Sequence, residues 1–216
     1  MPAICLDENE FTFPSVDEAD EEGLVLIGGA VTATRIIEAY SKGIFPWYNE
    51  DALPLWWSPD PRFVLFPDEL HVSRSMKKII NTNRFELRLN TSFENVVSYC
   101  ANTHRNEQVG TWITPGIKQA YTELHFKGIA HSAETWQNNE LVGGMYGIRL
   151  GNVFFGESMF SKVSNASKFA FISYVQHLQQ EGIQLVDCQV YTEHVESLGA
   201  KLIPREEYLL LLDRFV

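Results

Sequence analysis

The order of strand-like and helical stretches after residue 128 constrains the fold of this chain more than any other feature. IAHSAETWQ, LVGGMYGIRL and VFFGESMF have the pattern of three successive strands, with turn residues at Asn138-Asn139 and Gly151-Asn152. SNASKFAFISYVQHLQQEG has helical periodicity and is followed by the strand-like stretch LVDCQVYT. A meander, a long helix and a further strand predict an α/β chain with a mixed sheet.

The rest of the chain predicts shorter elements on both sides of this unit. Four helices and two strands are expected before the meander, and a short helix and a tail strand after LVDCQVYT. The helices are AVTATRIIEAYSKGIF, SRSMKKIINTNRF, TSFENVVSYCAN and PGIKQAYTELHFKG, the strands are FVLFP and FELRLN, and the last two elements are His194–Leu198 and AKLIP.

A segment rich in proline and tryptophan divides the chain near residue 60. GIFPWYNEDALPLWWSPDPR, from Gly43 to Arg62, contains four prolines and three tryptophans. Because proline fixes its own φ and lacks a backbone donor, the segment predicts no regular structure. We therefore expect a small N-terminal domain over residues 1–60 and a larger domain over residues 61–216.

Composition and cysteine usage favour a cytoplasmic protein. The chain has no run of eighteen apolar residues, and its N-terminus has neither a basic region nor an apolar signal core, so no membrane attachment is expected. The three cysteines, Cys5, Cys100 and Cys188, form no CxxC pair. Zinc and structural disulfides are therefore not expected either.

The negative charge of the chain is concentrated near its N-terminus. The formal net charge is −11, and residues 1–22 hold eight acidic residues and no Lys or Arg. The rest holds 20 acidic and 17 basic residues, so a local basic surface is compatible with the total. The densest basic group is Arg74, Lys77 and Lys78 on one predicted helical face, which is either a phosphate-binding surface or an ordinary solvated face.

Polar side chains interrupt two of the predicted strands. Alternation within LVDCQVYT places Asp187 and Gln189 together on one face, and Val186, Cys188 and Val190 on the other face, toward a core. Glu157 lies within VFFGESMF. If the two strands flank one crevice, these groups can bind an amine or accept its proton. The structural alternative is that Asp187 and Gln189 bond to loop backbone while Glu157 pairs with an arginine.

Apolar and aromatic residues are candidates for the walls of such a crevice. A hollow lined by Met and aromatic side chains suits a medium-sized apolar group, although the same residues are typical of an ordinary core. The pocket candidates are Met145, Phe154, Phe171, Tyr174 and Val186. Trp47 and Trp112 offer flat faces on which a base can stack, whereas Trp56 and Trp57 are expected to pack the proline-rich segment onto the larger domain.

The order of elements resembles the acetyltransferase-like (GNAT-like) α/β fold, in which a bent mixed sheet opens between its fourth and fifth strands. VFFGESMF and LVDCQVYT correspond to these two strands, and such folds hold an acyl group in the opening. An acetyl-CoA-dependent enzyme of this class has a glycine-rich loop before the long helix. At that position this chain has SKVSNASK, which contains no glycine, so the sequence disfavours an acetyl-CoA-dependent enzyme. Fold alone does not identify the chemistry.

Nine short blocks follow one another from Gly43 to Ala200. They are GIFPW, WWSPDPR, SRSMK, GTWIT, LVGGMYG, GESMFS, NASK, DCQ and SLGA. Together they resemble the leucyl/phenylalanyl-tRNA–protein transferases. The resemblance implies an enzyme that moves Leu or Phe, and less readily Met, from aminoacyl-tRNA to proteins with N-terminal Arg or Lys, which marks them for N-degron proteolysis. It implies neither cofactor nor metal, because the aminoacyl ester is already activated.

The same resemblance implies roles for the candidate residues. Asp187 would bind and orient the incoming α-amino group, with Gln189 beside the reacting ester and Glu157 in the same polar centre. Trp47 and Trp112 would bracket the terminal adenosine of the tRNA. The five pocket candidates would hold the leucine side chain, and the basic group would contact acceptor-stem phosphates. The group that takes the amine proton is left open, and a non-catalytic module that recruits a protease is the alternative to an enzyme.

Overall fold

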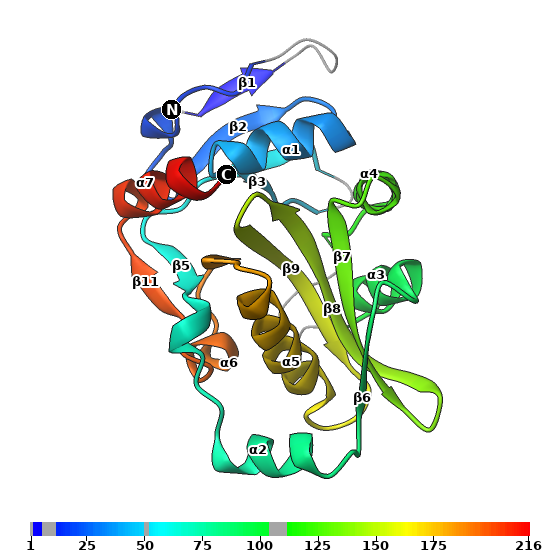
Figure 1. Cartoon of the computed structure of the whole chain (residues 1–216). Coiled ribbons are helices and arrows are strands. Elements are labelled where there is room, and N and C mark those ends of the chain that lie inside the picture. Colours follow the sequence, from blue (N-terminus) through cyan, green and yellow to red (C-terminus); the bar gives the residue numbers. More distant parts are fainter. Residues whose placement is uncertain (1, 6–11, 50–51, 104–111) are drawn as a thin grey trace.

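The computed structural model describes residues 2–5, 12–49, 52–103 and 112–216 (Figure 1). Three residues of the acidic segment (Asp7, Glu8 and Glu10) and the first two residues of GTWIT lie outside this range. A small N-terminal sheet is formed by β1 (Ala3–Cys5), β2 (Leu24–Gly28), β3 (Phe45–Pro46) and β4 (Leu55–Trp57), in the order β1-β2-β4-β3.

A second, seven-stranded sheet forms the larger part of the molecule (Figure 1). Its strands in chain order are β5 (Arg62–Leu65), β6 (Glu86–Leu89), β7 (Ala130–Gln137), β8 (Glu140–Leu150), β9 (Val153–Ser161), β10 (Leu185–Gln189) and β11 (Lys201–Ile203). Their order in the sheet is β11-β5-β10-β9-β8-β7-β6. The sheet is mixed, since β9 and β10 run parallel while the other neighbouring pairs run antiparallel.

The helices expected from the sequence are present. They are α1 (Ala33–Ser41), α2 (Arg74–Asn81), α3 (Phe93–Ala101), α4 (Pro115–Phe126), α5 (Ala166–Gln180) and α6 (Glu193–Glu196), with two short 3-10 turns at Val16–Glu18 and Pro67–Glu69. Several begin at side-chain caps: Thr32 caps α1, Ser73 caps α2 and Thr114 caps α4.

The predicted meander and its crossover helix position the opening in the sheet. β7, β8 and β9 pair in succession, and α5 then leads to β10. β9 and β10 pair only from Val153 opposite Leu185 to Phe155 opposite Asp187. Beyond these residues the two strands are no longer paired. The predicted fold class, a GNAT-like mixed sheet with a small N-terminal sheet, is therefore confirmed.

The expectation that the proline-rich segment has no regular structure is wrong. Two short strands, β3 and β4, lie within it. Pro46 is tolerated because β3 is the edge strand of the small sheet, where a missing N–H removes no bond to an outer neighbour. Pro54 and Pro59 flank β4 without interrupting it. The proline content of the segment does not reveal that β3 lies at the edge of a sheet, where proline is tolerated.

A C-terminal helix, α7 (Arg205–Phe215), was not expected from the sequence. Tyr208 and Leu212 of this helix are buried in the same apolar cluster as Ile36 of α1 and Trp56 of β4. Figure 1 shows α7 in red beside the N-terminal elements. The C-terminal helix thus packs against the N-terminal part of the chain.

The hydrophobic core consists of two clusters that lie on opposite faces of the large sheet. Phe154 belongs to the cluster under α5, and the next residue, Phe155, belongs to the cluster that includes α3 and α4. The latter also contains side chains from residues before 60, so one core spans both parts of the chain. The domain boundary near residue 60 stays a prediction. Among the described residues, no helix is long and apolar enough to cross a membrane.

Candidate active site

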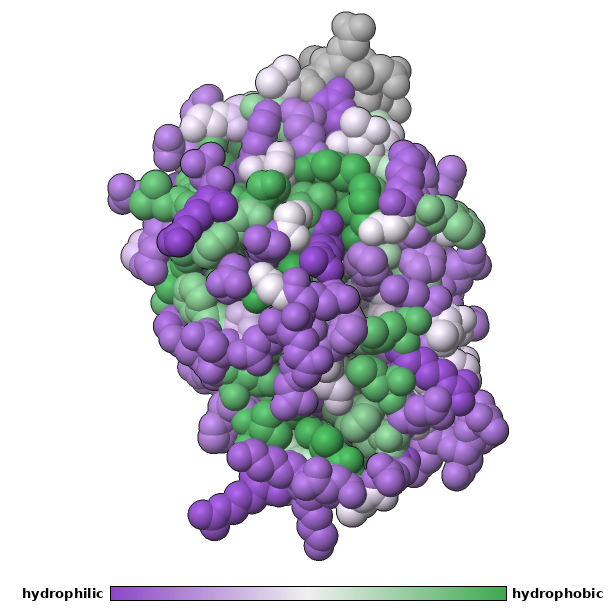
Figure 2. All heavy atoms as spheres, viewed as in Figure 1, coloured by the Kyte–Doolittle hydropathy of each residue, from purple (hydrophilic) through white to green (hydrophobic). Residues whose placement is uncertain are grey.

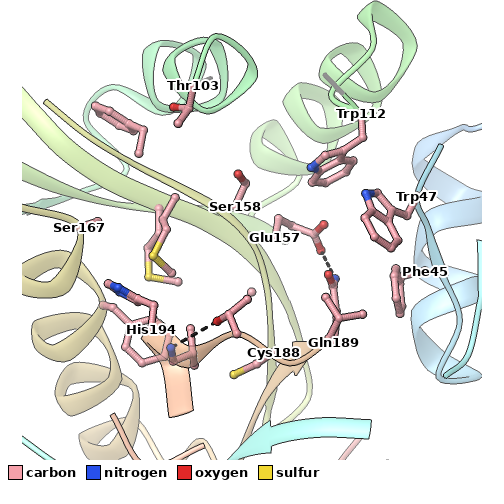
Figure 3. A pocket seen from close by; sticks show the side chains of 18 of the residues that line it. Phe45, Trp47, Thr103, Trp112, Glu157, Ser158, Ser167, Cys188, Gln189 and His194 are labelled. Atoms are coloured by element: carbon pink, nitrogen blue, oxygen red, sulfur yellow. Dashed lines mark hydrogen bonds between the residues drawn. The ribbon is translucent and has the colours of Figure 1, made fainter. Parts of the chain in front are cut away.

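A cavity of about 480 Å³ lies where β9 and β10 diverge. Figure 3 shows that its walls come from both sheets, from α5 and from the segment that follows β10. Its apolar walls include Met145, Met159, Phe160, Phe171 and Val195, its aromatic rim includes Phe45, Trp47 and Trp112, and its polar residues include Glu157, Ser158, Gln189 and His194. Among the residues that the structure describes, the side chains that line it include no Lys or Arg.

Glu157 and Gln189 face each other across the opening (Figure 3). Gln189 Nε2 donates to Glu157 Oε1 at 3.3 Å, and the Tyr40 hydroxyl of α1 donates to the same oxygen at 2.5 Å. The Tyr40 and Tyr121 hydroxyls are 2.9 Å apart, which brings α4 into the cluster. Four elements distant in sequence therefore hold one carboxyl group at the cavity wall.

Burial gives Glu157 the property of a proton acceptor at neutral pH. Desolvation raises its pKa from 4.5 to about 7, although the hydroxyls of Tyr40 and Tyr121 and the amide of Gln189 partly counter the shift. Burial also raises the pKa values of Tyr40 and Tyr121 well above 10, so both phenols stay neutral. Near pH 7 the carboxyl group thus exists in both protonation states, while its hydrogen-bond donors keep their protons.

Asp187 does not share a face with Gln189, contrary to the expectation from simple alternation. The pairing of β10 with β5 shifts between these two residues, and Gln189 adopts a positive φ of 63°. This bulge turns Gln189 toward the cavity while Asp187 stays fully buried and does not line it. Cys188 and Val190, expected to face a core, line the cavity instead, and Val190 is exposed.

The Asp187 carboxylate is occupied by four donors behind the cavity. Oδ1 accepts from Arg62 Nε and from the backbone N–H of Gln189, each at 2.9 Å. Oδ2 accepts from Arg62 Nη2 at 2.7 Å and from the Tyr208 hydroxyl at 2.9 Å. The pairing with an arginine that the sequence suggested for Glu157 is therefore made by Asp187. Its contact with the Gln189 N–H fixes the backbone from which the Gln189 side chain projects.

Arg62 also contacts two aromatic rings and a backbone carbonyl group. Its guanidinium lies 4.7 Å from the ring centroid of Phe45 and 4.6 Å from that of Tyr208, and its Nη1 donates to the Gly43 carbonyl at 3.2 Å. Burial would lower the pKa of Arg62, but the charge and hydrogen bonds of Asp187, together with the nearby Tyr208 and Tyr40, raise it above its ordinary value. Arg62 and Asp187 thus form a buried ion pair with two hydrogen bonds between them.

The five pocket candidates separate into two groups. Met145 and Phe171 line the cavity, but Phe154, Tyr174 and Val186 are buried in the adjoining core. Phe154 packs edge-on against Tyr174, with ring centroids 5.1 Å apart. The sequence did not identify Met159, Phe160 and Val195, because nothing in their spacing distinguishes cavity walls from core.

The two tryptophans expected to bind a base both line the cavity, at the end where Glu157 and Gln189 meet (Figure 3). Trp47 is 36% exposed and Trp112 is 7% exposed. Trp56 is fully buried, which agrees with its expected packing role, and its indole N–H donates to the Gly28 carbonyl at 2.9 Å.

The basic group Arg74, Lys77 and Lys78 lies on α2, away from the cavity walls. All three side chains are exposed, while Met76 between them is buried. Figure 2 shows hydrophilic side chains projecting at the end of the molecule where Figure 1 places α2. No ion pair found within the described ranges includes these three residues.

Four residues of the site were missed in the sequence. Arg62 ends the block WWSPDPR, and Tyr208 lies in REEYLLLLDRF, a stretch whose length and composition were sufficient to predict a helix. Tyr40 and Tyr121 gave no signal, because each is an ordinary apolar-face position of its helix. In the part of the chain that the structure describes, no group of three or more His, Cys, Asp or Glu side chains is placed to hold a metal ion.

An opened mixed sheet, an apolar cavity at the opening and a carboxyl–carboxamide pair on its wall together define a GNAT-like acyl-transfer protein. The family model described as leucyl/phenylalanyl-tRNA protein transferase matches residues 64–213, and the model of the N-terminal domain of that protein matches residues 29–60. The chain belongs to the leucyl/phenylalanyl-tRNA–protein transferase family, and the resemblance drawn from the nine sequence blocks is confirmed. It is therefore an aminoacyltransferase.

Two bacterial relatives agree with this assignment. The chain is 54% identical over 202 residues to the leucyl/phenylalanyl-tRNA–protein transferase of Christiangramia forsetii, covering 93% of this chain and 95% of the relative. It is 50% identical over 212 residues to the protein of the same name from Pseudomonas aeruginosa, covering 97% and 93%. A GCN5-related N-acetyltransferase from Kribbella flavida aligns over 78% of this chain and 59% of its own, with 10% identity and a TM-score of 0.42.

Proposed function

We propose that this chain transfers Leu or Phe, and less readily Met, from the 3′ end of aminoacyl-tRNA to proteins with N-terminal Arg or Lys. The new peptide bond is formed at the acceptor's α-amino group, and the added residue marks the protein for N-degron proteolysis. The observation that carries the proposal is the Glu157–Gln189 pair at the mouth of an apolar cavity with two tryptophans. Because aminoacyl-tRNA is made and used in the cytoplasm, we place the reaction there.

The cavity accommodates the donor in one orientation. The Leu or Phe side chain lies among Met145, Met159 and Phe171, which form a flexible apolar pocket. The terminal adenosine lies against Trp47 and Trp112, whose rings provide stacking surfaces. The ester between them then lies next to Glu157 and Gln189, where the acceptor amine must approach.

Glu157 is our candidate for the group that takes the amine proton. The α-amino group of a protein titrates near pH 8, so at neutral pH it must lose a proton before it can attack. Glu157, with a pKa of about 7, is close enough to accept that proton and to release it again. Glu157 takes the first proton from the protonated amine and later releases it to solvent. The neutral nitrogen then forms a bond to the carbonyl carbon, the carbon–oxygen bond to the ribose breaks, and the second proton that the nitrogen loses ends on the ribose oxygen.

Asp187 receives a different role from the one that the family resemblance implied. Its two oxygens already accept four hydrogen bonds, so it has little capacity left to bind an incoming amine. We propose that Asp187 is a positioning residue, which fixes the backbone of Gln189. The Gln189 amide then holds the amine and ester in register beside Glu157.

We propose that Arg74, Lys77 and Lys78 contact phosphates of the tRNA acceptor stem. They are exposed cations on one helix of an otherwise acidic chain. Binding through such contacts releases counterions, so donor affinity should fall as the salt concentration rises.

The function is tested by a transfer assay with purified protein, leucyl-tRNA and a peptide that begins with arginine. We expect mass spectrometry to show a product heavier by one leucine, with phenylalanyl-tRNA giving the corresponding phenylalanine product. The same peptide with an acetylated N-terminus is the control and should stay unchanged, because its nitrogen cannot attack. A folded protein that gives no product with leucyl-, phenylalanyl- or methionyl-tRNA would contradict the proposal.

A further inference from the structure

A second, smaller hollow lies beside the active-site cavity, on the N-terminal sheet. It has a volume of about 220 Å³ and is lined by Trp47, Tyr48, Asn49, Ala52, Leu55 and Trp57. Trp47 lines both hollows. A ligand that lies against Trp47 in the active-site cavity therefore has a neighbouring position for its next chemical group.

The lining of this hollow suits an uncharged, flat group. None of its six side chains is charged at neutral pH, and burial raises the pKa of Tyr48, which keeps that phenol neutral. The Trp57 indole N–H donates to the Trp47 carbonyl at 2.7 Å, and the Tyr48 hydroxyl lies 3.4 Å from the Thr114 hydroxyl. The aromatic side chains thus offer mainly apolar surface, and the described lining holds no charged group that would pair with a phosphate or with the cation of an acceptor residue.

Asn49 adds a polar group to this apolar lining. Its side chain is exposed at the hollow and carries both a donor and an acceptor. A ligand with a flat face and a polar edge matches aromatic walls with one carboxamide. A nucleobase has this combination, and stacking on aromatic side chains is the usual way in which proteins bind bases of single-stranded nucleic acid.

We propose that this hollow binds the cytosine of the nucleotide that precedes the terminal adenosine of the donor tRNA. The inference rests on the proposed function, which places that adenosine against Trp47. The Trp47 side chain then lies between the two successive bases. Sharing one residue between adjacent base sites explains why the hollow adjoins the cavity on the N-terminal sheet.

The test compares two minimal donors with a peptide that begins with arginine. One donor is adenosine that carries leucine on its ribose, and the other is the dinucleotide cytidylyl-adenosine that carries leucine on the same ribose. We expect kcat/KM to be about 5- to 150-fold higher for the dinucleotide donor, the range that stacking of one base corresponds to. A third donor, with an abasic sugar phosphate in place of cytidine, should react no better than leucyl-adenosine.

A matched pair of variants separates the hollow from its surroundings. Ala52→Phe fills the hollow from an exposed position and should reduce the advantage of the dinucleotide donor to about 1-fold. Leu53→Phe adds the same ring at the next residue, which is 62% exposed and does not line the hollow, and should keep the advantage.

Three results would overturn the inference. The first is equal kcat/KM for the two donors with the unmodified protein, and the second is an unchanged advantage in Ala52→Phe. The third is a full gain from the abasic donor, because the phosphate and not the base would then be bound. If no donor, leucyl-tRNA included, gives product with the unmodified protein, the proposed function itself fails. That outcome is distinct from the first three.

Discussion

Replacing Arg62 by methionine is expected to lower the free energy of unfolding by about 3–5 kcal/mol. The Asp187 carboxylate is fully buried, and Arg62 donates to both of its oxygens. Methionine keeps much of the side-chain length but removes the cation, so a buried negative charge loses its compensation. Urea unfolding followed by tryptophan fluorescence measures the change.

Arg149→Met is the matched control for this prediction. Arg149 also pairs with a carboxylate, Glu181, at 2.6 Å, but the two side chains are 31% and 42% exposed. We expect this variant to change the free energy of unfolding by no more than about 1 kcal/mol, because water replaces the lost partner. If Arg62→Met destabilised the protein as little as Arg149→Met, the buried pair would not hold the active-site strand in place.

Replacing Glu157 by glutamine is expected to lower kcat/KM for transfer by about 100-fold or more, which is the typical contribution of a positioned proton acceptor. The amide has the same shape and can still bond to Gln189, but it cannot take a proton from the amine. Transfer from leucyl-tRNA at subsaturating acceptor peptide, measured from pH 5.5 to 9, provides the comparison.

The pH profile distinguishes loss of a base from loss of a contact. In the unmodified protein kcat/KM should rise as pH increases through about 7, because the ionised form of Glu157 accepts the proton. In the glutamine variant that rise should be absent, and only the rise near pH 8 from the acceptor amine should remain. A variant that kept the rise near pH 7 would show that another group takes the proton.

Glu193→Gln is the control for the charge change. Glu193 lies on α6, is exposed and does not line the cavity. It should change kcat/KM by no more than about 3-fold, because an exposed charge is screened by solvent and salt. An equal loss in both glutamine variants would mean that overall charge, rather than Glu157, controls the rate.

The sequence was sufficient to predict the strands and the helix that position the site. The period of α5 and the turn residues of the meander are local signals, and they predicted the two strands that open around the cavity. The same pattern placed Glu157 and Gln189 on those strands, where the structure brings them within hydrogen-bonding distance. Local periodicity is a good guide when burial on one face determines the element.

The orientation of Asp187 was not predictable from the same pattern. A single bulge after this residue reverses the alternation, and a bulge depends on how β10 pairs with β5, a strand more than a hundred residues earlier. The partners of the polar centre are equally remote, since Tyr40 contacts Glu157 across 117 residues and Arg62 contacts Asp187 across 125. Such contacts follow from tertiary packing, and no local sequence pattern predicts them.

The most direct test of the account is a crystal structure with a stable donor analogue, in which an amide replaces the ester of leucyl-adenosine. We predict that the leucine side chain lies against Met145 and Phe171, that the adenine contacts Trp47 and Trp112, and that the carbonyl carbon lies beside Glu157 and Gln189. An analogue bound with its carbonyl away from Glu157 and Gln189, or with its adenine outside the two tryptophans, would contradict the assignment of this cavity as the site of transfer.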